Sequence, residues 1–180
     1  VLGGAVGFMI GGPLGAMLGV AFAGNFSKGK SNFGRSSKVF HPGDQQRVQA
    51  AFFSGVFSVM GYMAKVDGKV SKSEILLAQQ VMLHMQLSED MQKVAKALFH
   101  QGKGNDFNLE EVLEQFRTEC HRRTHLLRMF FEIQIQATYA DGVFDTKEHD
   151  ALKYIAQTLH FPIHELERLI QQFSATNNNT

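Results

Sequence analysis

The sequence contains no tryptophan, three prolines and one cysteine in 180 residues. A lone Cys120 excludes an intramolecular disulfide framework and indicates a reducing compartment. Scarce proline and the near absence of alternating β-branched residues favour an all-α fold. Acidic residues are missing before Asp44, and the formal net charge of the whole chain is only +1. The remainder of the chain is mildly acidic, which argues against nucleic acid as the main partner.

Charged and polar side chains are absent from the first 24 residues. About 20 apolar residues suffice for a helix to cross a bilayer, so residues 1–24 are predicted to form a transmembrane helix. Glycine recurs there at every fourth position, on one stripe of the helix, where it lets a second helix approach closely and favours self-association of the anchor. This glycine stripe consists of Gly3, Gly7, Gly11, Gly15 and Gly19.

Two alternatives to a membrane anchor stay open for this segment. A secretory signal peptide has a basic region followed by a shorter apolar core, and residues 1–24 show neither feature, although the chain does not begin with Met. A glycine-rich soluble loop is the second alternative, because glycine is abundant here. The length and complete apolarity of the run favour the anchor.

Positive charge follows the apolar run within residues 25–44, which are rich in Ser, Gly, Asn and Lys and are predicted to be a tether. These membrane-proximal basic residues are Lys28, Lys30, Arg35 and Lys38. By the positive-inside rule they place this side of the anchor in the cytoplasm and the N-terminus outside. Near anionic headgroups, each basic side chain adds about 1 kcal/mol of attraction.

Helical spacing of apolar residues dominates residues 45–174, where the pattern predicts a bundle of about seven helices. The expected helices cover 45–66, 72–85, 88–100, 108–116, 121–140, 146–159 and 162–173, with Ser88 and Asn108 as N-caps. Residues 121–140 are apolar on more than one face and are predicted to form the central buried helix. Residues 175–180 are predicted to begin a linker.

One local pattern occurs twice and gives the bundle an internal pseudo-repeat. Each copy is an Asp-Gly pair, one variable residue, an apolar residue, an N-cap, and a Glu three positions later. The glycine can take the left-handed conformation that stops a helix, and the N-cap and Glu form a capping box for the next helix. The copies are Asp67-Gly68 with Ser71 and Glu74, and Asp141-Gly142 with Asp145 and Glu148. The apolar residues before the caps, Val70 and Phe144, are placed for a hydrophobic staple.

This repeated corner resembles the signature of the TerB-like helical domain, and the resemblance covers roughly residues 47–173. Together with the glycine-rich apolar segment, the run from Leu127 to Ala137 (LRMFFEIQIQA) resembles membrane-anchored DnaJ-like co-chaperones of the DjlA type. That resemblance implies a single-pass protein of the bacterial inner membrane, with a periplasmic N-terminus and a cytoplasmic TerB-like domain. It also implies dimerisation through the membrane helix.

The resemblance further implies a C-terminal J domain that stimulates a DnaK-type chaperone on protein clients or within a membrane complex. Such a domain needs a His-Pro-Asp motif, but His41-Pro42 is followed here by Gly43. The J domain is therefore expected beyond Thr180, and no residue of this chain is assigned its activity.

Acidic residues of the two corners are the candidate ligands for a divalent cation, the one possible cofactor. Carboxylates are candidates because calcium and magnesium prefer oxygen ligands. The acidic residues of the two corners are Asp67, Glu74, Asp141 and Glu148. The resemblance to TerB-like domains points the same way and suggests a metal- or stress-responsive binding domain as the alternative function. The spacing is equally explained by capping alone, and Lys69 and Lys72 lie where an EF-hand loop has ligands.

A second group contains Cys120, His121 and His125, whose residue types can bind zinc. Four arginines in the same region oppose a cation and favour a solvated basic face. Two of them, Arg122 and Arg123, are candidate contacts for an acidic partner surface. Glu132, within an apolar run, is expected to lie at an exposed edge or to pair with a nearby arginine. No nucleophile–base pair or phosphate-binding loop is found in the sequence, so we expect an interaction module rather than an enzyme.

Overall fold

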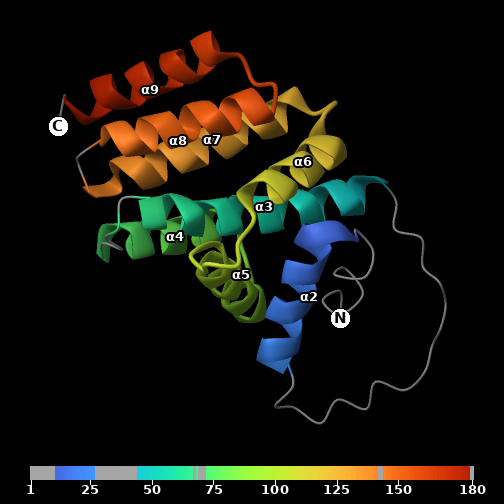
Figure 1. Cartoon of the computed structure of the whole chain (residues 1–180). Helices are drawn as coiled ribbons and strands as arrows, with labels where there is room; N and C mark the ends of the chain where they lie inside the picture. The colour runs from blue at the N-terminus through green and yellow to red at the C-terminus, as the bar shows by residue number, and fades with distance from the viewer. Residues whose placement is uncertain (1–10, 27–43, 67, 69–71, 142–143, 179–180) are drawn as a thin grey trace.

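The fold is all helical in the computed structural model, which describes residues 11–26, 44–66, 68, 72–141 and 144–178 (Figure 1). The helices are α2 (Gly12–Phe26), α3 (Asp44–Val66), α4 (Lys72–His84), α5 (Glu89–Gly102), α6 (Leu109–Cys120), α7 (Thr124–Thr138), the 3₁₀ turn η1 (Tyr139–Asp141), α8 (Thr146–Thr158) and α9 (Ile163–Asn177). The predicted all-α bundle is confirmed, and each predicted helix after residue 44 has an observed counterpart. Helix α9 continues to Asn177, four residues further than predicted, through residues expected to begin a linker.

Helix α3 is the centre of the bundle, with every residue of 50–61 buried. It contacts α2, α5, α6, α7 and α8, and Figure 1 shows it running between α7–α9 on one side and α2 and α5 on the other. The prediction that residues 121–140 form the central helix is wrong, because α7 exposes Arg128 and Met129. Helix α3 is central instead because its small residues let neighbouring helices approach from all sides.

Two serines lie within this buried helix without breaking it. The Ser54 hydroxyl donates to the Ala50 carbonyl at 2.6 Å, and the Ser58 hydroxyl donates to the Ser54 carbonyl at 2.6 Å. Each hydroxyl is thus satisfied by its own helix, which removes most of the cost of burying a polar group.

The tightest crossing is between α3 and α5, where two glycines face the opposite backbone. A Cβ atom on Gly61 would overlap the Phe99 carbonyl of α5, and one on Gly102 would overlap the Ser58 carbonyl of α3. The two helices can be this close only because both positions lack a side chain.

A chain of phenylalanine rings crosses the core from α3 to the segment before α9. Successive ring centroids lie 6.4 Å (Phe52–Phe116), 4.8 Å (Phe116–Phe130), 5.2 Å (Phe130–Phe131) and 4.5 Å (Phe131–Phe161) apart. The Phe116 ring occupies the space that Gly55 leaves open on α3. The abundance of phenylalanine in the sequence is therefore largely a property of packing.

The predicted helix caps at Ser88 and Asn108 are confirmed. The Ser88 hydroxyl accepts from the Met91 amide at 3.3 Å, and the Asn108 side-chain oxygen accepts from the Glu111 amide at 3.3 Å. These bonds satisfy amide groups that have no partner within their own helix.

Helix α2 begins at Gly12 and lies against α3, α5 and α6. Its buried face is Leu14, Leu18, Ala21 and Phe22, at helical spacing. Across the part of the chain that the structure describes, no helix has both the length and the apolar character needed to cross a bilayer. The predicted uninterrupted helix over residues 1–24 is not observed in its described part, because Gly11 and Gly12 have φ angles of +58° and +61°, outside the right-handed helical range. Residues 1–10 lie outside the described residues.

Candidate functional site

The second Asp-Gly corner, between α7 and α8, forms the capping box that its spacing predicts. Glu148 is 2% exposed, and its Oε2 atom accepts from the Asp145 amide at 3.0 Å. Asp145 Oδ1 in turn accepts from the Lys147 amide at 3.2 Å. Glu148 thus has a structural role at the start of α8 before any ligand is considered.

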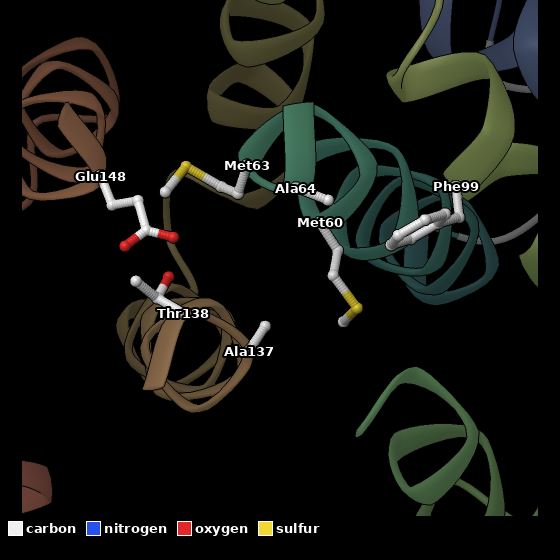
Figure 2. A pocket seen from close by; sticks show the side chains of 7 residues that line it. All are labelled: Met60, Met63, Ala64, Phe99, Ala137, Thr138 and Glu148. Carbon is white, nitrogen blue, oxygen red and sulfur yellow. The ribbon is translucent and has the colours of Figure 1, made fainter. Parts of the chain in front are cut away.

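Glu148 also lines a small cavity between α3, α7 and α8 (Figure 2). Its carboxylate points toward the Thr138 hydroxyl, and Met63 of α3 lies beside the carboxylate, whereas the Met60 side chain lies further away, on the side of Ala137. The remaining wall is apolar, and the lining residues are Met60, Met63, Ala64, Phe99, Ala137, Thr138 and Glu148. With a volume of about 10 Å³, the cavity has room for about one water molecule.

The other predicted cation ligands cannot be placed beside Glu148. Asp67 lies outside the described residues, as do the side chains of Glu74 and Asp141. Within the described ranges, no three His, Cys, Asp or Glu side chains gather closely enough to hold a metal ion. The cation site therefore stays a prediction. At the first corner, the prediction that Gly68 stops α3 is confirmed by its φ of +72° and by its amide bond to the Lys65 carbonyl at 2.9 Å.

Thermal melting with and without calcium tests directly whether the corner acids bind a cation. We expect added calcium to leave the melting temperature unchanged, because the Glu148 carboxylate is already buried and bonded in the capping box. Real binding would instead add about 2.7 kcal/mol to the free energy of unfolding at 100 times the dissociation constant. A calcium-dependent stabilisation that Glu148→Gln abolishes, and that Glu165→Gln on α9 leaves intact, would overturn this expectation and establish the site.

Aromatic side chains surround the second corner more extensively than the single staple that the sequence predicts. The rings of Tyr139 and Phe144 stack at 4.8 Å, and Phe144 meets the His149 ring at 5.5 Å, which is the predicted staple position. The Tyr139 and Ser174 hydroxyls share a hydrogen bond of 2.6 Å, and His149 Nε2 lies 2.8 Å from Glu167 Oε1. These contacts fasten the corner to α9.

The predicted zinc group is divided between the core and the surface. Cys120 is fully buried, and that burial, with a smaller effect of Glu119, raises the pKa of its thiol to about 12 although Arg123 opposes the shift. His121 is exposed, and its Nδ1 pairs with the Thr118 carbonyl at 2.9 Å. A protonated thiol inside the core is a poor zinc ligand, because the metal binds thiolate.

The basic face is present at the turn between α6 and α7. Arg122 is exposed and Arg123 is half-buried. Arg128 Nε bonds Glu132 Oε1 at 3.1 Å, which confirms the expected pairing of Glu132 with a nearby arginine. The assignment of Arg122 and Arg123 to a partner surface stays a prediction. The membrane-proximal lysines and arginine, at 28, 30, 35 and 38, lie outside the described residues.

Glutamine side chains of the bundle bind the backbone of α2. Gln115 Oε1 accepts from the Leu14 amide at 2.7 Å, and Gln115 Nε2 donates to the Gly11 carbonyl at 2.8 Å. Gln101 Nε2 donates to the Met17 carbonyl at 3.0 Å. Within the predicted glycine stripe, Gly15 is buried and Gly19 borders open space, whereas Gly3 and Gly7 lie outside the described residues.

Comparison with known protein families shows which family this helical bundle belongs to. The family model described as tellurite resistance protein TerB matches residues 54–171, which is more than half of the chain. The chain belongs to the TerB family. The matched region runs from the middle of α3 into α9 and leaves out α2.

The relatives that match the chain include several that are named co-chaperone protein DjlA. Those from Legionella pneumophila, Coxiella burnetii and Escherichia coli K12 are 37%, 35% and 38% identical to the chain over 97%, 99% and 88% of its length. The alignments cover 60%, 67% and 57% of these relatives, so the chain spans about 60% of the length of the proteins it matches. The predicted resemblance to DjlA-type co-chaperones is confirmed. No solved structure matches the chain.

Proposed function

We propose that this chain is the anchoring and adaptor region of a membrane-bound DnaJ-like co-chaperone, with no catalytic activity of its own. The observation that carries the proposal is the identity of 35–38% to proteins named co-chaperone DjlA, over nearly the whole chain. About two fifths of these relatives is not covered by this sequence. The J domain, which would recruit and stimulate a DnaK-type chaperone, is assigned to that uncovered part.

The first 24 residues are assigned to a single-pass anchor in the bacterial inner membrane. The absence of any charged or polar side chain there supports this assignment, and the basic residues at 28, 30, 35 and 38 orient it. The TerB-like bundle then faces the cytoplasm, where the chaperone and its clients are. Arg122 and Arg123 are assigned to contact with an acidic partner surface.

Self-association of the anchor is assigned to the glycine stripe. Gly19→Ile should abolish dimerisation in a membrane, because the larger side chain keeps a second helix from approaching. In the structure a Cβ atom at Gly19 meets nothing within 4 Å, so the added side chain begins in open space beside α2. Dimerisation is measured by cross-linking in membranes, with Val20→Ile as the matched control off the stripe. An unchanged dimer in the Gly19 variant would contradict the role of the stripe.

A reading of the gene beyond the codon for Thr180 tests the co-chaperone assignment. We expect a helical hairpin whose connecting loop contains His-Pro-Asp. A stop codon soon after residue 180 would contradict the proposal.

A further inference from the structure

Helix α2 is capped by the bundle and not by its own sequence. Its N-cap, Gly11, has no side chain, and Pro13 has no amide to donate. The oxygen that an N-cap Ser or Asp would offer to the third helical residue comes instead from Gln115 of α6, which accepts from the Leu14 amide at 2.7 Å. The side-chain amide of Gln115 also donates to the Gly11 carbonyl at 2.8 Å, so this one side chain binds a backbone donor, at Leu14, and a backbone acceptor, at Gly11.

The left-handed backbone at this point favours glycine, and a larger residue would displace the Gln115 side chain. Gly12 has a φ of +61°, and a Cβ atom there would lie 2.7 Å from Gln115 Oε1. A second glutamine, Gln101 of α5, donates to the Met17 carbonyl at 3.0 Å one turn further along. The surface formed by α3, α5 and α6 therefore recognises this helix through its backbone as well as through Leu14, Leu18 and Phe22.

The docked helix leaves part of an entirely apolar surface in water. From Gly12 to Gly24 it has no polar side chain, yet Val20 is 63% exposed and Gly19 and Gly24 border open space. A helix that is apolar all round is stable when it is fully buried in protein or in lipid. The bundle covers only one face, so a bilayer offers this helix an environment that the dock does not.

We infer that the surface of α3, α5 and α6 is a dock for the chain's own anchor helix, and that it competes with the lipid bilayer for residues 12–26. The inference rests on the anchor proposed above and adds a second position for that anchor. In water, Gln115 and Gln101 hold α2 against the bundle, which buries Leu14 and Leu18. In the presence of a membrane, α2 leaves the dock and both of its faces enter lipid.

The test uses the absence of tryptophan from the chain. Val20→Trp, on the exposed face of α2, should fluoresce in buffer as a water-exposed indole. It should then shift to the blue when vesicles of phosphatidylethanolamine and phosphatidylglycerol are added. In this background, Gln115→Ala and Gly12→Ala weaken the dock from its two sides. Each should lower the lipid concentration at half-maximal shift about tenfold, because a cap and a further hydrogen bond no longer oppose release.

Two matched controls should leave that lipid concentration unchanged. Gln171→Ala removes an exposed glutamine from α9, and Gly24→Ala, off the glycine stripe, adds the same methyl group to α2 where nothing lies within 4 Å. Circular dichroism confirms that each variant keeps the helical fold before lipid is added.

Each other outcome overturns a defined part of the account. Blue shifts at one lipid concentration for all variants would leave the anchor standing and refute the competing dock. No shift with any variant would refute the anchor itself. A blue shift that grows with protein concentration without lipid would assign the exposed face of α2 to a second copy of the chain and not to the bilayer.

Discussion

Phe116→Ala should destabilise the bundle by about 4 kcal/mol, the middle of the range for removing a buried aromatic ring. Phe116 is fully buried, lies 4.8 Å from the Phe130 ring, and packs directly on Gly55 of the central helix. Its removal leaves a cavity that α3 cannot fill, because the facing position has no side chain. The loss is a large fraction of the 5–15 kcal/mol that holds a typical domain together.

Equilibrium unfolding in urea measures this effect. Tyr154→Ala, which removes an aromatic residue that is 44% exposed on α8, is the matched control and should change the free energy of unfolding by less than about 0.5 kcal/mol. If Phe116→Ala lowered the free energy of unfolding by no more than this control does, the chain of phenylalanine rings would not be the core of the bundle. Phe116→Leu keeps most of the volume and should cost about 1.5 kcal/mol or less, so it stays measurable if the alanine variant does not fold.

Alanine at either glycine of the α3–α5 crossing should cost about 3 kcal/mol, the upper end for adding a methyl group to a packed core. The added Cβ atom would overlap the backbone carbonyl of Phe99 in Gly61→Ala and that of Ser58 in Gly102→Ala. A backbone cannot rotate away as a side chain can, so the helices must separate. Chemical unfolding again provides the measurement, with Gly19→Ala as the control in an open part of α2.

The losses of unfolding free energy in Gly61→Ala and Gly102→Ala should also be less than additive in the double variant. Once one methyl group has moved α5 away from α3, the second meets less resistance, and neighbouring sites commonly show coupling of 0.5–3 kcal/mol. Full additivity in the double variant would contradict a shared crossing. The control should be neutral or stabilising by up to about 1 kcal/mol, because alanine favours a helix over glycine.

Local patterns were sufficient to predict the helices, since their causes lie within a few residues. Ser88 and Asn108 cap the helices that follow them, and Gly68 ends α3 with a left-handed φ. Phe144 packs beside the capping box at Asp145 and Glu148, as the repeated corner predicts. Each of these features joins residues at most five positions apart.

Features that join distant residues were not predicted. Hydrophobic periodicity selected 121–140 as the central helix because it gives weight to large side chains, whereas α3 is central because Gly55, Ser58 and Gly61 are small. The contact between Gln115 and the start of α2 spans 101 residues and has no sequence signal. The candidate cation site could not be tested as a set, since of its four acids only the Glu148 side chain is described.

The measurement that tests the proposed function most directly is single-turnover ATP hydrolysis by a DnaK-type chaperone. The full-length gene product should accelerate hydrolysis, and substitution of the histidine in its His-Pro-Asp loop should remove the effect. Residues 1–180 alone contain no His-Pro-Asp and should leave the rate unchanged. A full-length protein that does not accelerate hydrolysis would contradict the co-chaperone assignment.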